Sequence, residues 1–287
     1  MRQSAETKTG FAFISPVLIH FAVFFWIPLI FILLLSFGQW DMFGTPKFVG
    51  IENYKELFSD RFFVKSLLIS VTYALSTTVL LTFLGMAFAF LFDRPGPIAA
   101  MARILFFMTA IMPLISAAAI WVWITGPEGY SGLNLVLRFF GFSPLRWQAD
   151  PQLALGTVIG FSIWKNVGFN ILIFTAGLRG IPAVYQDAAK VDGANWLQRI
   201  LFITIPMLKP TTLFLVVINM INGWNVFTPV WFLTHGGPGT ATRILTTHIY
   251  HYGFGQFKYG YASAASVVLV GIVLVFTYFR LRGVKNE

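Results

Sequence analysis

Residues Tyr185–Pro210, YQDAAKVDGANWLQRILFITIPMLKP, form a polar, charge-bearing segment between two long apolar runs, Gln152–Leu178 and Thr211–Thr234. Each apolar run has the length of about 20 residues that a membrane-spanning helix needs. A helical segment with a glycine break and a proline stop at one membrane surface has the features of a docking site for another protein. An ordinary interfacial loop is the alternative that these residues leave open.

The composition extends the membrane prediction to the whole chain. Of its 287 residues, 57% are hydrophobic and only 11% are charged, whereas soluble domains carry about 25% charged residues. We therefore expect one integral membrane bundle. The chain has no cysteine, which excludes disulfides, thiolate chemistry and Cys-based zinc sites. Its net charge of +9 is scattered over short loops, which indicates membrane topology rather than nucleic-acid binding.

Six apolar segments are long enough to cross a membrane. None alternates apolar and polar residues as a barrel strand does, so each is expected to be a helix. The segments are Phe11–Phe37, Ser66–Phe92, Ile104–Thr125, Gln152–Leu178, Thr211–Thr234 and Tyr259–Phe279. The predicted fold class is an all-α integral membrane protein with six transmembrane helices, the first of them an uncleaved span. Pro28 and Pro113 are expected to kink the spans that contain them.

The basic residues predict the orientation of the spans. Six spans place both termini on the same side of the membrane. Residues 1–10, 93–103, 179–210 and 280–287 on that side hold eleven Lys and Arg, whereas the longer loops on the other side hold eight. The positive-inside rule therefore places both termini and the Tyr185–Pro210 segment in the cytoplasm.

The Tyr185–Pro210 segment and the residues just before it carry local signals for two short helices. Pro182 is suited to a helix start, and Ala183–Val191 can form a helix with Val184, Ala188 and Val191 on one stripe. Gly193 can adopt the left-handed conformation that ends a helix. Either Asp192 or Asn195 could cap the next helix, which runs through Trp196 and Ile200. Pro206 and Pro210 are then expected to redirect the chain into the fifth span.

These residues resemble the EAA loop of permease subunits of binding-protein-dependent ABC importers. That pattern is Glu-Ala-Ala, three residues, Gly, nine residues, then Ile, any residue, Leu-Pro. Here Asp187, Ala188 and Ala189 occupy the triplet, Gly193 the glycine and Ile203–Pro206 the end, at the same spacing. The sequence departs from the pattern in having Asp in place of Glu at 187 and Ile in place of Leu at 205.

Four further motifs resemble the carbohydrate-uptake group of these permeases, such as the maltose and glycerol-3-phosphate systems. They are Gly50–Tyr54, Phe92–Arg94, Trp164–Lys165, and Phe232–Pro238 followed by Ala241–Thr242. The resemblance implies the type I ABC importer permease fold. It also implies a domain organisation in which residues 1–65 hold the N-terminus, the first helix and the first periplasmic loop. Residues 66–281 hold the five-helix core, with the EAA coupling loop at 183–206 and a cytoplasmic tail at 282–287.

The resemblance further implies the partners and the division of labour. Two six-helix permeases, here expected to be non-identical, would form one translocation path in the bacterial inner membrane, and an ABC ATPase dimer would dock at Ala183–Arg199. A periplasmic or lipid-anchored solute-binding protein would contact the outer segments Gly126–Asp150 and His235–Lys258. No phosphate-binding G-x-x-x-x-G-K-[ST] loop is present. The chain is therefore expected to be non-catalytic and without a cofactor, with Mg-ATP on the partner ATPase. Within the coupling loop, Asp187, Ala188, Ala189, Asp192, Gly193 and Pro206 are the expected docking residues.

The translocation path is expected where the spans carry polar residues. In the fifth span Asn219, Asn222 and Asn225 recur every three residues, with Trp224 beside them. Amides that faced lipid would cost several kcal/mol, so they should face the interior. Amides with aromatic faces suit a neutral, hydroxyl-rich solute such as a sugar or polyol, although polar contacts between helices are an equal alternative.

Lys165 is the one charged residue inside a predicted span, and Asn166 and Asn170 are its neighbours. It could contact an anionic solute, pair with a carbonyl of the partner permease, or extend to the membrane surface. We count Lys165 and Asn170 among the candidate path residues.

Two other function classes fit the sequence less well. An ion-coupled secondary transporter of a small polar solute usually keeps carboxylates within the membrane, but all eleven acidic residues here lie in predicted loops. A membrane-embedded enzyme would need an acidic metal cluster or a base at the membrane surface. His248 and His251 have metal-ligand spacing, but no carboxylate or thiol joins them, so they are interpreted as loop residues. The sequence does not specify the solute.

Overall fold

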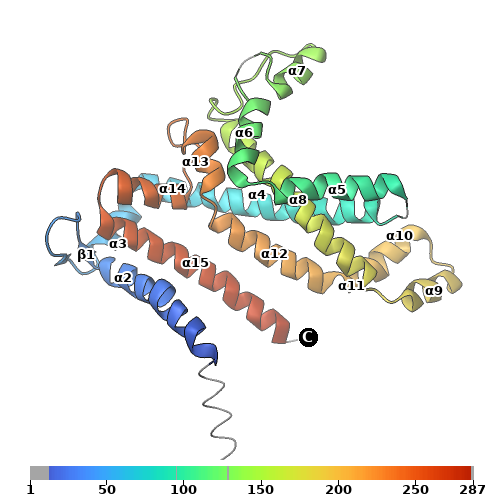
Figure 1. Ribbon diagram of the computed structural model, residues 1–287, viewed down its shortest axis with the longest axis horizontal. Coiled ribbons are helices and arrows are strands. Elements are labelled where there is room, and N and C mark those ends of the chain that lie inside the picture. Colours follow the sequence, from blue (N-terminus) through green and yellow to red (C-terminus); the bar gives the residue numbers. More distant parts are fainter. Residues whose placement is uncertain (1–12, 95, 128, 286–287) are drawn as a thin grey trace, which may run out of the picture. The chain divides into compact units, whose positions relative to one another are not determined.

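A computed structural model describes residues 13–94, 96–127 and 129–285, and of 279–285 the backbone alone (Figure 1). The predicted cytoplasmic N-terminus, with Arg2 and Lys8, lies outside the described residues, as does the start of the first predicted span at Phe11. The described chain divides into two compact units. Residues up to Phe63 together with His248–Ile272 form the first unit, and Val64–Thr247 with the residues from Val273 onward form the second.

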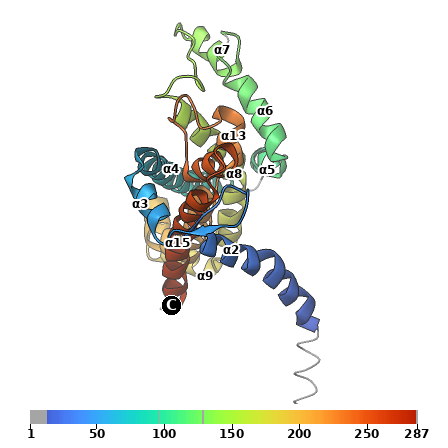
Figure 2. The ribbon, with the colours of Figure 1, turned by 90° about the vertical axis from the view of Figure 1, so that its left-hand side faces the viewer.

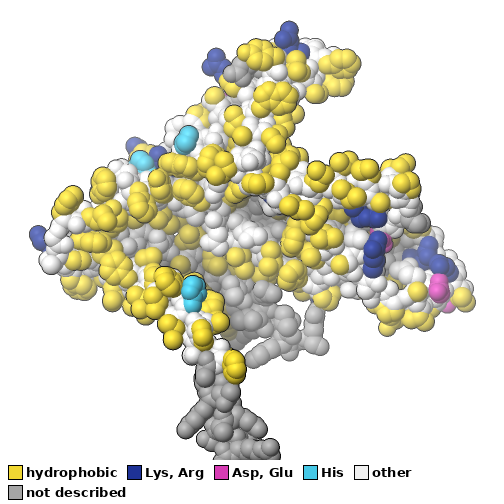
Figure 3. All heavy atoms as spheres, in the orientation of Figure 1, with side chains coloured by type: hydrophobic (Ala, Val, Ile, Leu, Met, Phe, Trp, Pro, Cys, Tyr) yellow, Lys and Arg dark blue, Asp and Glu magenta, His cyan; other side chains and the backbone are white. Residues whose placement is uncertain are grey.

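The described helices confirm an all-helical membrane protein. Four single helices are long and apolar enough to cross a membrane, or six spans are present if each of two bent helix pairs is counted as one. The single helices are Phe13–Leu35, α4 (Arg61–Phe92), α8 (Ala154–Arg179) and Tyr259–Tyr278 within α15 (Tyr259–Lys285). The bent pairs are α5 (Pro97–Ile111) with α6 (Leu114–Ile124), and Trp196–Met207 with α12 (Lys209–Trp224). Hydrophobic side chains cover much of the described surface in Figure 3, as expected for helices that face lipid.

The third predicted span is broken rather than kinked. Helix α5 ends at Ile111, and α6 continues at an angle of 108° to it. Pro113 has no N–H to continue the helix, and the residue before a proline is pushed into extended backbone, as the ψ of 138° at Met112 shows. The prediction of a kink at Pro113 within one helix over Ile104–Thr125 was therefore wrong in the size of the bend, since two separate helices meet there.

The fifth predicted span is also not one helix. Helix α12 ends at Trp224, and a separate helix α13 (Thr228–Thr234) begins after the irregular residues Asn225–Phe227. Pro229 lies in the first turn of α13, where its missing N–H is harmless, but it could not have continued α12. At the first predicted kink, a π-helical turn, η1 (Ala22–Trp26), directly precedes α2 (Ile27–Leu35), which contains Pro28.

The first unit contains the described part of the first helix, a small strand pair and the short helix α3 (Glu52–Ser59). The strands β1 (Gly38–Gln39) and β2 (Lys47–Phe48) are two residues long each and pair antiparallel, with Gly38 opposite Phe48, within the helical fold. The unit is completed by the end of α14 (Leu245–Tyr250), the π-helical turn η3 (His251–Gly255) and the start of α15. Buried Leu57, Phe63, His248 and Tyr261 form its interior.

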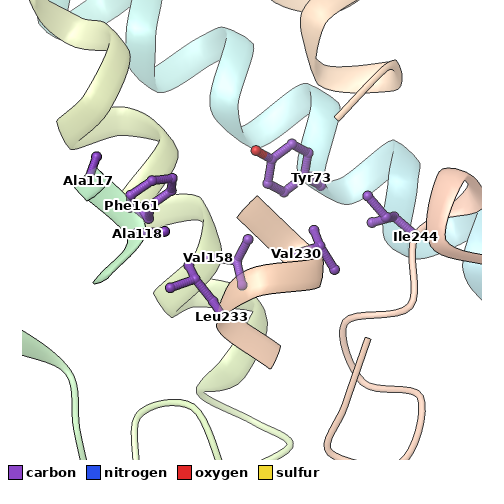
Figure 4. Packing of buried hydrophobic residues seen from close by; sticks show 8 residues of the cluster. All are labelled: Tyr73, Ala117, Ala118, Val158, Phe161, Val230, Leu233 and Ile244. Carbon is purple, nitrogen blue, oxygen red and sulfur yellow. The ribbon is translucent and has the colours of Figure 1, made fainter. Parts of the chain in front are cut away.

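The second unit contains most of α4, the helices α5, α6, α8 and α12, and the predicted docking segment. In Figures 1 and 2, α5 runs beside α8, and α6 leads from α5 to the short helix α7 (Gly132–Phe139). Its main hydrophobic cluster joins α4, α6, α8 and α13 (Figure 4). The buried members are Tyr73, Ala117, Ala118, Val158, Phe161, Val230, Leu233 and Ile244.

Candidate functional site

The docking segment begins with helix α9 (Ala183–Val191), and Pro182 is its N-cap residue. The helix ends in a Schellman motif. The Gly193 N–H donates to the Lys190 carbonyl at 3.1 Å, and the Ala194 N–H donates to the Ala189 carbonyl at 2.9 Å. Gly193 has φ +77°, the left-handed conformation that a side chain disfavours. The sequence prediction of a helix that ends at this glycine is confirmed.

The second helix of the segment is capped by Asn195, so the choice between the two predicted caps is settled. The Asn195 side chain accepts from the Gln198 N–H at 2.9 Å, and the Gln198 side chain accepts from the Asn195 N–H at 2.8 Å. Asp192 is instead the C-cap residue of α9. The helix runs on through α10 (Trp196–Arg199), the π-helical η2 (Ile200–Thr204) and α11 (Ile205–Met207). It then bends by 62° into α12, as the prolines at 206 and 210 predicted.

Helix α9 packs with one face on its own chain and leaves the other face exposed. Ala189 is buried, and Gln186 Nε2 donates to Oγ1 of Thr204 in η2 at 3.0 Å. On the opposite stripe, Val184 is 66% exposed and Val191 is 88% exposed. An apolar helix face that the described residues of its own chain leave uncovered fits a groove on another protein.

Charged residues border this apolar stripe. Asp187 pairs with Lys190 at 2.8 Å, but both side chains are more than half exposed. Such a surface pair contributes at most about 1 kcal/mol, so the Asp187 carboxylate can exchange Lys190 for a cation on a partner. Asp192 is exposed at the end of α9, and Pro206 is exposed in the first turn of α11.

A second candidate site is a cavity of about 300 Å³ in the second unit. Its polar lining comes from α4, α8, α12 and the residue that follows α12. The polar residues are Tyr73, Thr77, Ser162, Asn166, Asn170, Asn219, Asn222 and Asn225, with Thr228 at the start of α13. None of the described residues that line it carries a charge. The cavity brings together four of the six residues that we predicted for the path, namely Asn170, Asn219, Asn222 and Asn225.

The amides of this cavity divide into two kinds. Asn219 and Asn170 are buried and pair with each other, the Asn219 Nδ2 donating to the Asn170 Oδ1 at 2.8 Å. The Asn170 Nδ2 in turn donates to the Asn166 carbonyl at 3.2 Å. This pair is a contact between α12 and α8, as the polar-contact alternative described. Asn222 and Asn225 are exposed in the cavity wall, where a solute can reach them.

The two other predicted path residues lie outside the cavity lining. Trp224 is buried, and its ring lies 6.3 Å from that of Phe276. Lys165 is also buried, and its Nζ donates to the Ala110 carbonyl at 2.7 Å. Ala110 lies in the last turn of α5, where the break before Pro113 leaves carbonyls without helical partners and the helix dipole is negative. Lys165 therefore pairs with a carbonyl of its own chain in this structure.

Sequence reasoning missed the contribution of α4 to the cavity. The Tyr73 hydroxyl lies 2.5 Å from Ser162 Oγ, which joins α4 to α8, and Thr77 lines the wall one turn further. Ser70, Tyr73 and Thr77 share one face of a helix at spacings of three and four residues. That polar stripe in an otherwise apolar span is the signal that could have identified them.

The two histidines with metal-ligand spacing lie in different surroundings. His248 is fully buried, with its Nε2 3.1 Å from the Tyr261 hydroxyl, whereas His251 Nε2 lies 3.2 Å from Gln256 Nε2. Among the described residues, no group of three or more His, Asp or Glu side chains could hold a metal ion.

Comparison with known proteins gives one family and one fold. Residues 81–283 match the family described as "Binding-protein-dependent transport system inner membrane component". The probable ABC transporter permease protein YesP of Bacillus subtilis is 36% identical over 277 residues, which covers 95% of this chain and 89% of that protein. The trehalose/maltose transport system permease protein MalF of Thermococcus litoralis is 31% identical, covering 96% of this chain and 94% of that protein.

Among solved structures, a chain of the bacterial alginate ABC transporter in complex with an alginate pentasaccharide-bound periplasmic protein superimposes with a TM-score of 0.85. The sequences are 21% identical, and the match covers 97% of this chain and 94% of that chain. At this identity the likeness concerns the fold, and it agrees with the predicted type I importer permease fold.

Proposed function

The chain belongs to the family of binding-protein-dependent transport system inner membrane components, as a non-catalytic permease subunit of an ABC importer, and we propose that its solute is a carbohydrate. In this proposal it forms half of a translocation path, paired with a second, non-identical permease. Both termini lie in the cytoplasm of a bacterium, and the spans cross its inner membrane.

The docking segment supports the proposal that an ATPase dimer drives the transport. The exposed stripe of Val184, Ala188 and Val191 on α9 presents small and branched apolar side chains to a groove on the ATPase. An ATPase that closes around ATP would move α9 only if it binds the two states of the permease with different affinity. Asp187 and Asp192 at the border of the stripe offer carboxylates to cations on the ATPase.

A continuous set of contacts leads from α9 to the cavity, and the proposed function as an ATPase-driven path rests on this observation. The bond between Gln186 and Thr204 ties α9 to η2, and η2 continues through α11 into α12. The bend between α11 and α12 is held by fully buried Leu208. Because α12 carries Asn219 and Asn222 into the cavity wall, a movement of α9 would change the geometry of the cavity.

The cavity supports a neutral, hydroxyl-rich solute. The exposed amides of Asn222 and Asn225 can donate to and accept from hydroxyl groups, and Phe169 and Phe227 provide apolar faces in the same lining. An anionic solute such as a glycerol phosphate would find no cation among the described lining residues, because Lys165 is not one of them. The trehalose/maltose assignment of the Thermococcus litoralis relative agrees with this choice.

The external partner in this proposal is a solute-binding protein. The alginate transporter of similar fold was solved with such a periplasmic protein bound. On this chain we assign the contact to the outer segments Gly126–Asp150 and His235–Lys258. The first of these is organised around Asn134, whose side chain bonds Leu145 and Trp147, so it presents a defined surface.

Uptake by the reconstituted transporter tests the carbohydrate proposal. The transporter is purified with its native partners, and uptake of labelled maltose, trehalose and sn-glycerol 3-phosphate is measured with ATP. The variant Asn222→Leu with Asn225→Leu should abolish sugar uptake while the complex and its Tm are retained. The contrasting variant Asn219→Leu should lower the Tm, because it removes the donor to the Oδ1 of buried Asn170. Sugar uptake that is unchanged in the first variant, or uptake of the phosphate ester alone, would contradict the proposal.

A further inference from the structure

The first unit contains a cavity of about 550 Å³ that neither the translocation path nor the docking segment uses. Its walls come from residues 39–56, between the first helix and α4, and from residues 256–261 at the start of α15. We propose that this cavity is a second carbohydrate-binding site, which holds one or two sugar units of the solute. Its size lies within the range of about 300–1,000 Å³ that is typical of small-molecule sites.

The two parts of the wall are joined by specific contacts, so the cavity is a built feature of the unit. Buried Asn53 donates to the carbonyls of Ser36 at 2.9 Å and Gly38 at 2.8 Å. The Tyr259 N–H donates to the Trp40 carbonyl at 3.2 Å. Gly260 approaches Gly38 so closely that a Cβ at 260 would lie 2.0 Å from the Gly38 oxygen. These contacts hold the backbone segments that carry the lining side chains in fixed positions.

Aromatic rings at the rim of the cavity supply flat apolar faces. Phe43 is 85% exposed and Phe257 is 53% exposed, although both line the cavity. The ring of Trp40 is held against that of Tyr259, with their centroids 5.6 Å apart. Exposed aromatic faces beside polar groups are suited to a ligand with an apolar face and a hydroxylated edge, which is how a pyranose ring is built.

The polar groups of the lining are nearly balanced in charge. Carboxylates come from Asp41, Glu52 and Glu56, and ammonium groups come from Lys47 and Lys258. Glu56 pairs with Lys258 at 3.0 Å, and both side chains are about half exposed. Paired in this way, they keep lone pairs and N–H groups that can bond hydroxyls through charge-assisted hydrogen bonds. A neutral polyhydroxylated ligand can donate hydrogen bonds to the carboxylates and accept them from the ammonium groups. An anion would be repelled by the carboxylates, and a cation by the ammonium groups.

The backbone conformation provides an independent indication of function at the same place. Phe257 has φ +57°, and Met42, between the lining residues Asp41 and Phe43, has φ +71°. A residue with a side chain adopts this left-handed conformation only at an energetic cost, whereas glycine adopts it readily. Strained backbone of this kind gathers at ligand sites, where the side chain is needed in spite of the conformational cost. At position 257 the retained group is the aromatic ring that lines the cavity.

The choice of a carbohydrate as the ligand rests on the proposed function. The assignment of the cavity to the outer side of the membrane rests on the predicted topology. Residues 38–60 and 251–258 belong to the predicted outer loops, so the cavity would meet the solute on the side from which it is delivered. A site there would retain the solute close to the entrance of the path.

Ligand binding to the purified full-length chain in lipid nanodiscs tests the proposal. Saturation-transfer NMR is recorded with maltose, trehalose and sn-glycerol 3-phosphate at about 10 mM each, a concentration suited to millimolar Kd values. The test variant is Phe43→Ala with Phe257→Gly, which removes both rings and relieves the strain at 257. The matched control is Phe48→Ala, since Phe48 lies on the same strand pair, is 84% exposed and does not line the cavity. A third variant, Asn222→Leu with Asn225→Leu, removes any signal from the amide-lined cavity of the second unit.

The Phe43 and Phe257 substitutions are also added to the Asn222 and Asn225 variant, because the amide-lined cavity would otherwise contribute its own sugar signal. We expect a sugar signal in the wild type, in Phe48→Ala and in the Asn222 and Asn225 variant, and at least a fivefold weaker signal in the combined variant, at a Tm no lower than that of the Asn222 and Asn225 variant. A sugar signal that persists in the combined variant would overturn the proposal, as would the absence of a sugar signal in the Asn222 and Asn225 variant. Loss of solute-binding-protein affinity in the combined variant with an unchanged sugar signal would identify the cavity as a protein contact, which also overturns it. Failure of this site is distinguishable from failure of the proposed function, because ATP-driven uptake of maltose or trehalose is measured separately.

Discussion

Replacing Gly193 with alanine should weaken the binding of the ATPase while leaving the membrane bundle intact. Gly193 has φ +77° at the end of α9, and a Cβ placed there would meet no atom of the described residues within 4 Å. The substitution therefore causes no steric clash with neighbouring residues. Its whole cost lies in holding an alanine in the left-handed conformation, which is about 1–2 kcal/mol.

This cost destabilises the capped form of α9, which is the form that we expect the ATPase to bind. The Schellman bonds of Gly193 and Ala194 set the direction in which the chain leaves α9, so an alanine would shift the segment toward conformations in which α9 is frayed. If the ATPase binds only the capped form, its affinity should fall by about 5- to 30-fold. Gly193→Pro should have a larger effect, because proline fixes φ near −65° and removes the N–H that bonds the Lys190 carbonyl.

The chain offers a matched control for this change. Gly141 ends helix α7 with φ +80°, its N–H donates to the Arg138 carbonyl, and the Phe142 N–H donates to the Leu137 carbonyl. In the part of the chain that the structure describes, a Cβ at 141 would also meet no atom within 4 Å. Gly141→Ala therefore carries the same local cost in a predicted outer loop. ATPase affinity is measured on the permease in nanodiscs by titration with labelled ATPase, and the Tm of each variant is recorded. Equal losses of affinity in the two variants, or no loss in Gly193→Ala, would refute the docking of the ATPase at α9.

Three further predictions concern single side chains. Lys165→Met should lower the free energy of unfolding by about 1–3 kcal/mol, because the Ala110 carbonyl loses its donor; a Tm equal to that of the wild type would contradict this. Asn195→Ala should cost about 1 kcal/mol of helix stability and reduce ATPase affinity about fivefold in the same titration, with sugar binding unchanged. Burial raises the pKa of Asp60, but hydrogen bonds from Tyr261, Phe62 and Tyr252 outweigh it and hold the pKa below the ordinary 3.8. The stabilisation from this carboxylate is therefore complete above about pH 4 and is lost as the pH falls through the lowered value, so acid unfolding should be less steep in Asp60→Asn.

The helices and the docking segment could be predicted because their signals are local in the sequence. Long apolar runs identify spans, and the positions of Pro182 and Gly193 bound α9 correctly. The choice between Asp192 and Asn195 as a cap could not be made, because both residue types suit the role. Only the reciprocal bonds between Asn195 and Gln198 decide it.

The breaks within spans cannot be predicted from hydropathy, because hydropathy carries no information on the direction of the helix axis. Met112 and Pro113 are as apolar as their neighbours, yet the helix axis turns by 108° there. For the same reason the irregular residues Asn225–Phe227 were included in a continuous span. A proline signals that a helix is disturbed, and the packing around it decides by how much.

The cavities could be predicted only where one helix carries several of the lining residues. The spacing of Asn219, Asn222 and Asn225 revealed the amide-lined cavity, but it did not show that Asn219 pairs with Asn170 on α8. The cavity of the first unit combines residues about 200 positions apart, such as Glu56 and Lys258, so no local pattern announces it.

Site-directed cross-linking to the ATPase tests the central claim most directly. The chain contains no cysteine, so a single Val191→Cys substitution on the exposed stripe of α9 can carry a thiol-anchored photo-cross-linker. Phe139→Cys on α7, at a side chain that is 85% exposed, is the control. We predict an ATPase cross-link from position 191 and none from position 139 in native membranes. An ATPase cross-link from neither position, or from position 139 alone, would contradict the account.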